Sequence, residues 1–365
     1  ARLHRTQDLL RSKALETERL VGEVQRFQEA ETGSQGGASV GSKAEAPVLP
    51  EQRRVVRKIH EAELTCIVAA EAQQAPLPRS LVAVGTANGY VKLLDGSNAR
   101  LHAQLSVSRD LPHIVSVDLA PATGLLLAAS TDHALRLLDL RAQRLLHVLR
   151  GHQGPLSACG FLKGGSQAFT ASSDRTVKLW DLEKGQMLRS LPASSAVTCA
   201  DVHASSGCIA TGYSDGGVSI WDPRIGDAFS MPWAVRSRCS IAGIRFAPDG
   251  RSLLSQAEDG GVCSTACDTM QPLLTLGGLG PISGRSSPPA HSADGAYLLA
   301  RGTNRLRCWS TATGEVAFDH ETEAPIAVCW DLPQAFSVHA SGYVAMWGAA
   351  GKAGSDSAVP EGGSP

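Results

Sequence analysis

The octapeptide DRTVKLWD at residues 174–181 decides the fold of this chain, because altered copies of it recur along the sequence. The copies are NGYVKLLD (88–95), DHALRLLD (132–139), DGGVSIWD (215–222), the longer DGGVCSTACD from Asp259, TNRLRCWS (303–310) and SGYVAMWG (341–348). Each begins with turn residues, continues with alternating side chains and ends near a tryptophan or its replacement. The positions equivalent to Trp180 are 38 to 44 residues apart. Seven copies at this period predict seven similar structural units.

Each unit is predicted to contain four short antiparallel strands. An alternating run such as SIAGIRF (240–246) leads through a Pro-Asp-Gly turn to a second apolar run, and the DRTVKLWD copy forms the third strand. A repeat of this length with four strands is typical of a WD-repeat propeller blade. The sequence therefore predicts an all-β fold, a seven-bladed WD-repeat β-propeller over residues 52–348. Residues 54–59 are expected to complete the seventh blade and close the ring.

The flanking segments differ from the repeats in composition. Residues 1–31 place Leu3, Leu10, Leu20, Val24 and Phe27 on an approximate heptad seam, which predicts an N-terminal amphipathic or coiled-coil helix. Residues 32–50 are rich in glycine and serine and read as a flexible linker. Residues 349–365 have almost nothing to bury and are expected to be a disordered tail.

The composition narrows the class of protein. Lysine and arginine total 34 against 35 acids, a balance that argues against a nucleic-acid binder driven by a strong positive field. The nine cysteines form no CxxC pair, so we expect small buried thiols in a reducing compartment and neither a zinc site nor a disulfide framework. No apolar run approaches the roughly 18 residues of a membrane helix. The sequence begins at Ala1 and shows no signal peptide, and we expect a cytoplasmic protein or part of one.

One unit carries a set of polar residues that resembles a hydrolase triad. We interpret His152, Ser172, Asp174 and Trp180 as the structural hydrogen-bonded tetrad of a WD-repeat blade, with Ser172 tied to Trp180 at a strand end. A catalytic serine would need exposure, activation and an oxyanion hole, and no nucleophile-elbow glycines surround this one. P-loop, GxGxxG and HExxH motifs are also absent from the sequence. We therefore predict no enzyme activity, no cofactor and no metal.

Turns between strands are the candidate binding positions. The residues expected to contact partners on one face of the ring, or in a loop between blades, are Asn88, Asp132, His133, Arg175, Asp215, Arg236 and Arg238. The basic run at 53–58 is either a solvated outer strand or a docking patch for acidic protein or anionic lipid.

Two stretches carry a resemblance to a known family. LRGHQGPLSACGFLKGGSQAFTASSDRTVKLWDLEKGQMLRSL (149–191) and SGCIATGYSDGGVSIWDPR (206–224) resemble the central blades of the autophagy-related protein 16 family. In that family a Gly-His blade is followed by a blade that lacks the Gly-His pair. The resemblance covers about residues 52–348, and residues 1–31 would match the end of the family's coiled coil.

The resemblance implies a non-enzymatic scaffold of autophagy. Family members bind the conjugate of autophagy-related proteins 5 and 12 through a segment upstream of the coil. They dimerise through the coil and position the conjugate for lipidation of autophagy-related protein 8 at autophagosome-forming membranes. Adaptors would bind the propeller, contact with membranes would be peripheral, and residues 1–31 would support a homodimer. The polar seam residues Lys13 and Thr17 weaken that last expectation.

Two alternatives stand beside this interpretation. A generic WD-repeat adaptor, such as a G-protein β-like subunit or a ubiquitin-ligase substrate receptor, would combine a helix with the same ring. An enzyme built on a propeller would need carboxylates, histidines or metal ligands converging on the central channel, and the sequence places no such cluster there.

Overall fold

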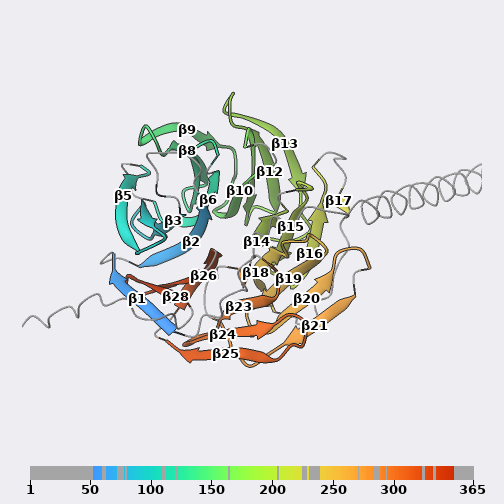
Figure 1. Cartoon of the computed structure of the whole chain (residues 1–365). Helices are drawn as coiled ribbons and strands as arrows, with labels where there is room; N and C mark the ends of the chain where they lie inside the picture. Colours follow the sequence, from blue (N-terminus) through green and yellow to red (C-terminus); the bar gives the residue numbers. More distant parts are fainter. Residues whose placement is uncertain are drawn as a thin grey trace, which may run out of the picture. The chain divides into compact units, whose positions relative to one another are not determined.

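The computed structural model describes residues 52–348. It leaves out 60–62, 72–77, 79, 109, 111, 121, 163–164, 204, 224–227, 230–238, 270, 283–287, 293, 323–324 and 332–333. The described part forms seven four-stranded antiparallel sheets, which surround a central axis as blades (Figure 1). The all-β, seven-bladed architecture predicted from the repeats is confirmed. The predictions for 1–31, 32–50 and 349–365 fall outside the described residues.

Consecutive strands form each of the first six blades. Blade 1 has β2 (Leu64–Glu71), β3 (Ser80–Thr86), β4 (Tyr90–Asp95) and β5 (Arg100–Ser106). Blade 2 has β6 (Ile114–Ala120), β7 (Leu125–Ser130), β8 (Ala134–Asp139) and β9 (Arg144–Arg150). Blade 3 has β10 (Leu156–Phe161), β11 (Gln167–Ser172), β12 (Thr176–Asp181) and β13 (Gln186–Pro192).

The second half continues in the same order. Blade 4 has β14 (Val197–Val202), β15 (Ile209–Tyr213), β16 (Val218–Trp221) and β17 (Ala228–Phe229). Blade 5 has β18 (Ile241–Phe246), β19 (Ser252–Ala257), β20 (Val262–Ala266) and β21 (Pro272–Leu276). Blade 6 has β22 (Ala290–His291), β23 (Tyr297–Arg301), β24 (Arg305–Ser310) and β25 (Val316–Glu321). Blade 7 has β26 (Pro325–Asp331), β27 (Gln334–His339), β28 (Tyr343–Gly348) and β1 (Gln52–Lys58).

The ring closes inside the seventh blade. β1, from the start of the described chain, pairs antiparallel with β28 at its end, and Gln52 lies opposite Gly348 while Lys58 lies opposite Tyr343. Figure 1 shows the blue β1 beside the red β28. The closure expected from residues 54–59 is confirmed. The two ends of the described ring thus share one four-stranded blade, and closure of this kind leaves a propeller with only short, protected strand edges.

The core is divided among the contacts between neighbouring blades. Seven clusters of buried apolar residues occur, and each combines side chains from two adjacent blades. Trp180 of blade 3, for example, is 2% exposed and packs with Leu127 and Leu149 of blade 2. A single blade could not bury its own apolar faces, so stability depends on stacking around the ring.

Blades 5 and 6 depart most from the repeat. Thr265 occupies the tryptophan position of blade 5. At this position the register between the third and fourth strands shifts, and the same shift occurs in blades 1, 2, 3 and 6. In blade 6 the first strand contains only Ala290 and His291, because proline cannot donate to a strand ladder and Pro288 and Pro289 precede them. Gly243 makes room for that segment, since a Cβ there would lie 2.7 Å from the Cα of Pro288.

Strand direction gives the ring two distinct faces. Within each blade the first and third strands run the same way, so the turns between second and third strands share one face with the connections between blades. We call this the upper face. The turns that join first to second and third to fourth strands lie on the opposite, lower face.

Candidate functional site

A chain of hydrogen bonds links the upper turn of blade 3 to its tryptophan. The indole Nε1 of Trp180 donates to Thr170 Oγ1 at 2.7 Å, and Thr170 Oγ1 lies 2.8 Å from Nε2 of His152. The Nδ1 atom of His152 then lies 2.8 Å from Oδ2 of Asp174. Burial lowers the pKa of His152, against the opposing effect of Asp174, so the ring is neutral at physiological pH. A neutral ring with its proton on Nδ1 satisfies every member of the chain.

The sequence interpretation was wrong about one link in this chain. Thr170, not Ser172, contacts Trp180, and the Ser172 hydroxyl instead bonds the carbonyl oxygens of Gly154 and Pro155 at 3.0 and 2.9 Å. Trp180 lies opposite Ala168 in the sheet, two residues from Thr170 and four from Ser172. Two residues of a strand span roughly 6.8 Å, which puts Ser172 beyond the reach of the indole.

The network does not provide a nucleophile. The Thr170 and Ser172 side chains are both completely buried, and the Thr170 oxygen already accepts the indole proton. His152 and Asp174 are engaged in holding the turn, where Asp174 also accepts the backbone N–H of Gln153 and the Thr176 hydroxyl. These contacts join the upper turn of blade 3 to the connection before it.

Blades 4 and 7 repeat the first two links of this chain with different residues. In blade 4, Trp221 donates to Thr211 at 2.9 Å, and Thr211 bonds the Tyr213 hydroxyl at 2.9 Å. In blade 7, Trp347 donates to Ser337 at 2.8 Å, and Ser337 lies 2.9 Å from Nε2 of His339. Tyr213 and His339 occupy the position of Ser172, so each reaches the hydroxyl from within its own strand. The sequence interpretation missed both.

Blade 2 uses an ion pair at the corresponding turn. Arg136 is 2% exposed, and its Nη1 bonds Asp132 Oδ1 at 2.9 Å and Ser130 Oγ at 2.6 Å. Burial would raise the pKa of Asp132, but the Arg136 and Ser130 hydrogen bonds outweigh it and lower that pKa to about 2. Asp132 is thus committed to its own blade rather than free for a partner.

The other predicted binding residues differ in their surroundings. Asn88 accepts the Thr86 hydroxyl at 2.7 Å and caps its own turn. Arg175 and Asp215 are exposed on upper turns, and His133 is half-buried on another. Arg236 and Arg238 lie outside the described residues. The upper face therefore brings Asn88, His133, Arg175 and Asp215 to equivalent turns of four consecutive blades.

Two of these residues adopt a backbone conformation that disfavours side chains. His133 has φ 66° and Arg175 has φ 65°, at the turn position where Gly89, Gly216, Gly260 and Gly342 serve other blades. The left-handed region costs an L-residue roughly 1–2 kcal/mol. Such local strain concentrates at binding and catalytic sites, where a particular side chain is needed.

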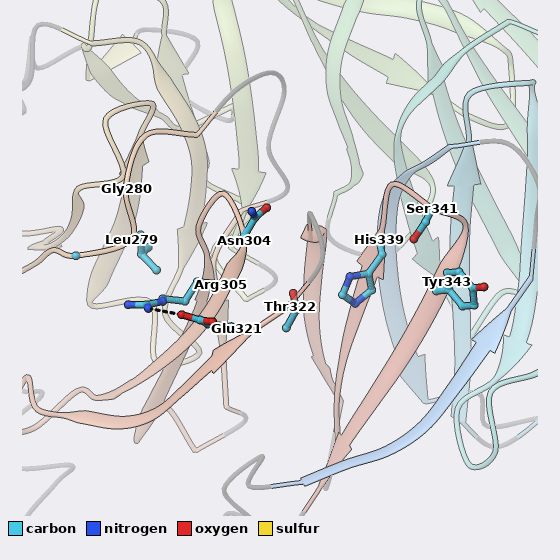
Figure 2. Close-up of a pocket in the computed structure, with 10 residues that line it drawn as sticks. Leu279, Gly280, Asn304, Arg305, Glu321, Thr322, His339, Ser341 and Tyr343 are labelled. Carbon is cyan, nitrogen blue, oxygen red and sulfur yellow. Dashed lines mark hydrogen bonds and ion pairs between the residues drawn. The ribbon is translucent and has the colours of Figure 1, made fainter.

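A polar groove opens on the upper face between blades 6 and 7 (Figure 2). It has a volume of about 880 Å³. Figure 2 shows Arg305 and Glu321, paired at 3.2 Å, on one side and His339 and Tyr343 on the other. The groove presents both charges and several hydroxyls and amides, which suits a peptide segment better than an apolar small molecule.

Two half-buried acids, Asp118 and Asp201, lie among the residues of the first strands that line the central channel. Asp118 accepts the backbone N–H of Phe161 in the next blade, and Asp201 accepts that of Phe246, both at 2.8 Å. Burial raises the pKa of Asp118 to about 6 despite those hydrogen bonds, and it raises the pKa of Asp201 as well. Arg245 approaches Asp201 at 4.0 Å. Each acid therefore links the first strands of two adjacent blades through a hydrogen bond.

The described residues also show which metal sites, membrane-spanning helices and buried cysteines this part of the chain contains. These residues contain no group of three or more His, Cys, Asp or Glu positioned to hold a metal ion. Within the same part of the chain, no helix has the length and apolarity needed to cross a membrane. Five of the cysteines are buried, namely Cys66, Cys159, Cys199, Cys308 and Cys329.

Comparison with protein families agrees with the geometry. The family described as "WD domain, G-beta repeat" matches residues 143–181 and 185–222, which cover the Trp180 and Trp221 networks. The chain is a seven-bladed propeller of WD repeats. The two matched repeats end at Asp181 and Asp222, immediately after the tryptophans whose hydrogen bonds are described above.

Several curated proteins are similar to this WD-repeat propeller. Protein tipD of Dictyostelium discoideum is 33% identical over 150 residues, which are 40% of this chain and 24% of that protein. WD repeat-containing protein 90 of Homo sapiens is 29% identical over 248 residues, 66% of this chain and 14% of the relative. Autophagy-related protein 16 of Arabidopsis thaliana is 26% identical over 265 residues, 70% of this chain and 51% of the relative. The aligned part of this chain thus spans only a quarter, a seventh and about half of these proteins.

Proposed function

We propose that this propeller is a non-enzymatic protein-docking platform whose upper face receives partner proteins. One observation carries the proposal: His133 and Arg175 occupy left-handed turn positions that glycine fills in four other blades. The ring itself does not need side chains there. Because Arg175 is exposed, its charge is available to a partner while the turn beneath it is held by Asp174.

The position of the groove between blades 6 and 7 also favours the upper face as the docking surface. It lies on the side of the ring that carries the upper turns, since it is lined by Asn304 and Ser341 from those turns and Thr322 from a connection between blades. A partner that crosses the upper face would meet single exposed charges at the turns and hydrogen-bonding groups in the groove. Propellers of WD repeats bind proteins through such surfaces, where a few anchoring residues dominate affinity.

We further propose that the platform serves autophagy. The similarity to Autophagy-related protein 16 of Arabidopsis thaliana covers 70% of this chain, and the blade order at 149–224 resembles that family. On this proposal the protein is cytoplasmic and acts peripherally at autophagosome-forming membranes. It helps to position the conjugate of autophagy-related proteins 5 and 12 for lipidation of autophagy-related protein 8. The conjugate would bind upstream native sequence, and adaptors would bind the propeller.

Affinity capture from starved cells tests the proposal. The tagged protein, with its native upstream sequence, should recover the covalent conjugate of autophagy-related proteins 5 and 12 on a denaturing blot. A capture with residues 1–365 alone should lose the conjugate and keep propeller-bound adaptors. Recovery of a helical subunit or a cullin adaptor in place of the conjugate would instead support the generic adaptor.

A matched pair of variants tests the upper face in the same capture. Arg175→Gly removes the exposed charge and relieves the strained backbone, so the fold should keep its stability within about 1 kcal/mol. Adaptor recovery should fall at least several-fold. Lys184→Ala removes an exposed cation, 71% exposed, from a lower turn of the same blade and should leave recovery unchanged. Equal loss in both variants would contradict a docking role for the upper face.

A further inference from the structure

A second hollow lies on the lower face, away from the proposed docking surface. It has a volume of about 300 Å³ and lies between blades 5 and 6, beside the turns at Pro248–Asp249 and Asp294–Gly295. A volume of this size is at the lower limit for sites that hold a whole small ligand. It is sufficient for one large side chain and its adjacent backbone.

The wall is mixed, and leucines with one tryptophan supply much of its apolar part. Blade 5 contributes leucines from its second and outer strands, and blade 6 contributes Leu298 and Trp309. Among the outer-strand leucines, Leu273 is 61% exposed and Leu274 is half-buried, so an apolar surface is accessible at the entrance. A bulky aliphatic or aromatic side chain would bury this surface, which is the main source of affinity at small anchoring sites.

His291 gives the hollow an unusual polar group. The equivalent position is apolar in the other six blades: it is aromatic in blades 3, 5 and 7 (Phe161, Phe246 and Trp330) and aliphatic in blades 1, 2 and 4 (Ala69, Leu119 and Val202). Both ring nitrogens of His291 are buried without a hydrogen-bond partner among the described residues. Unpaired buried polar atoms are rare and costly, and they commonly mark a missing water or ligand.

The protonation state of His291 determines which hydrogen-bond partners its two ring nitrogens need. Burial and the nearby Arg245 lower the pKa of His291 to about 4, with Asp249 opposing them, so the ring is neutral at physiological pH. A neutral imidazole has one N–H donor and one acceptor nitrogen. Because both nitrogens are buried, a peptide in the hollow reaches one of them only after a half-turn of the ring about its χ2 bond, which exchanges each nitrogen with a ring carbon. A peptide group supplies the matching carbonyl and N–H.

The charge at the entrance of the hollow determines which residue is favoured next to the inserted side chain of a peptide. The ionised side chains that line the hollow are Asp249 and Asp294, both exposed at lower turns. Each has one carboxylate oxygen engaged with its own turn, Asp249 with the N–H of Arg251 and Asp294 with the N–H of Ala296. Their negative charge favours a lysine or arginine next to the buried side chain.

We propose that the hollow between blades 5 and 6 binds an extended peptide of a partner protein, with a leucine or phenylalanine inserted and an adjacent basic residue facing Asp249 and Asp294. His291 bonds the main chain of that peptide. The site is on the opposite face from Arg175 and is independent of the autophagy proposal.

Fluorescence polarisation with designed probes tests this site on the full chain. The probe is a labelled decapeptide of glycine and serine that carries one Leu-Lys pair, and the comparison probes carry Ala-Lys or Leu-Glu. The wild-type chain should bind Leu-Lys at least tenfold more tightly than either comparison probe. If Leu-Lys binds no better than Ala-Lys at millimolar concentration, the hollow holds only water and the proposal is overturned.

Variants locate the binding within the molecule. His291→Phe restores the residue of blades 3 and 5 and removes the unpaired nitrogens, so its unfolding midpoint should equal or exceed that of the wild type. Its affinity for Leu-Lys should fall at least tenfold. Asp249→Asn should reduce the preference for Leu-Lys over Leu-Glu, while Asp181→Asn, at a lower turn of blade 3, should not. Wild-type affinity in a stably folded His291→Phe chain would overturn the proposal, whatever the autophagy capture shows.

Discussion

Blades 2 and 3 hold the same upper turn in two different ways. In blade 3 a neutral histidine from the preceding connection bonds Asp174, and a buried threonine and tryptophan continue the chain. Blade 2 has Leu138 at the tryptophan position, and Arg136 from its third strand bonds the equivalent Asp132. Both blades keep the aspartate of the turn, but its hydrogen-bond donor comes from the connection before the blade in blade 3 and from the third strand in blade 2. A WD repeat can therefore lose its histidine and tryptophan without losing the turn.

The largest expected loss of stability comes from truncating the buried side chain at the tryptophan position, and it should differ between the two blades. Trp180→Ala should lower the free energy of unfolding by about 3–5 kcal/mol, because it empties the contact between blades 2 and 3 and leaves Thr170 without its donor. Leu138→Ala, at the equivalent position, should cost about 2–3 kcal/mol, since no hydrogen bond is lost with it. Urea unfolding of both variants measures the difference. Equal losses would mean that the indole hydrogen bond contributes nothing.

The next effect tests the buried ion pair of blade 2. Asp132→Ala should cost about 3 kcal/mol, because it leaves the Arg136 guanidinium buried without its counter-ion. Asp174→Ala should cost less, since its partner His152 is neutral. Adding Arg136→Met to Asp132→Ala should recover most of the loss in the same unfolding assay. A double variant that is no more stable than Asp132→Ala would show that Arg136 does not need its partner.

Acid should weaken blade 2 by a smaller amount. The pKa of Asp132 is lowered to about 2 in the folded chain, so its contribution is complete above the unfolded value near 4 and is lost as the pH falls toward 2. The shift corresponds to about 2 kcal/mol. The stability advantage of the wild type over Asp132→Asn should shrink by about two-thirds of that amount between pH 5 and pH 2.5. An advantage that stays constant over this range would contradict the lowered pKa.

The smallest effect tests which hydroxyl bridges blade 3. Thr170→Val keeps the shape of the side chain but leaves Trp180 Nε1 and His152 Nε2 unpaired, at a cost of about 2 kcal/mol. Ser172→Ala should cost about 1 kcal/mol, because the hydroxyl bonds only to backbone groups, those of Gly154 and Pro155 before β10 and of Asp174 in the turn. Thermal unfolding of the two variants gives the ranking. The reverse order would make Ser172 the bridge.

Much of the fold followed from the repeat itself. The spacing of the DRTVKLWD copies predicted the number of blades, and the lack of an apolar strand after Trp347 indicated that residues near 54–59 complete the seventh blade. These features depend on chain connectivity and on period, which a single sequence displays directly.

The network residues were harder to predict for a physical reason. Thr170 and Ser172 are two residues apart and point to the same side of their strand, so alternation cannot tell which one reaches Trp180. Tyr213 and His339 replace the missing histidine from within a strand, where their sequence pattern reads as ordinary core. Arg136 is likewise indistinguishable from a surface arginine until Asp132 is placed beside it.

The closure at β1 and β28 determines how the ring responds to force. Gln52 and Gly348, the two ends of the described chain, lie opposite each other at the same end of this strand pair. Tension applied between them would load the hydrogen bonds one pair at a time, from Gln52 toward Lys58, rather than shear all of them together. The seventh blade would therefore open first and at low force, and the six blades built from consecutive strands would keep their sheets until it had opened.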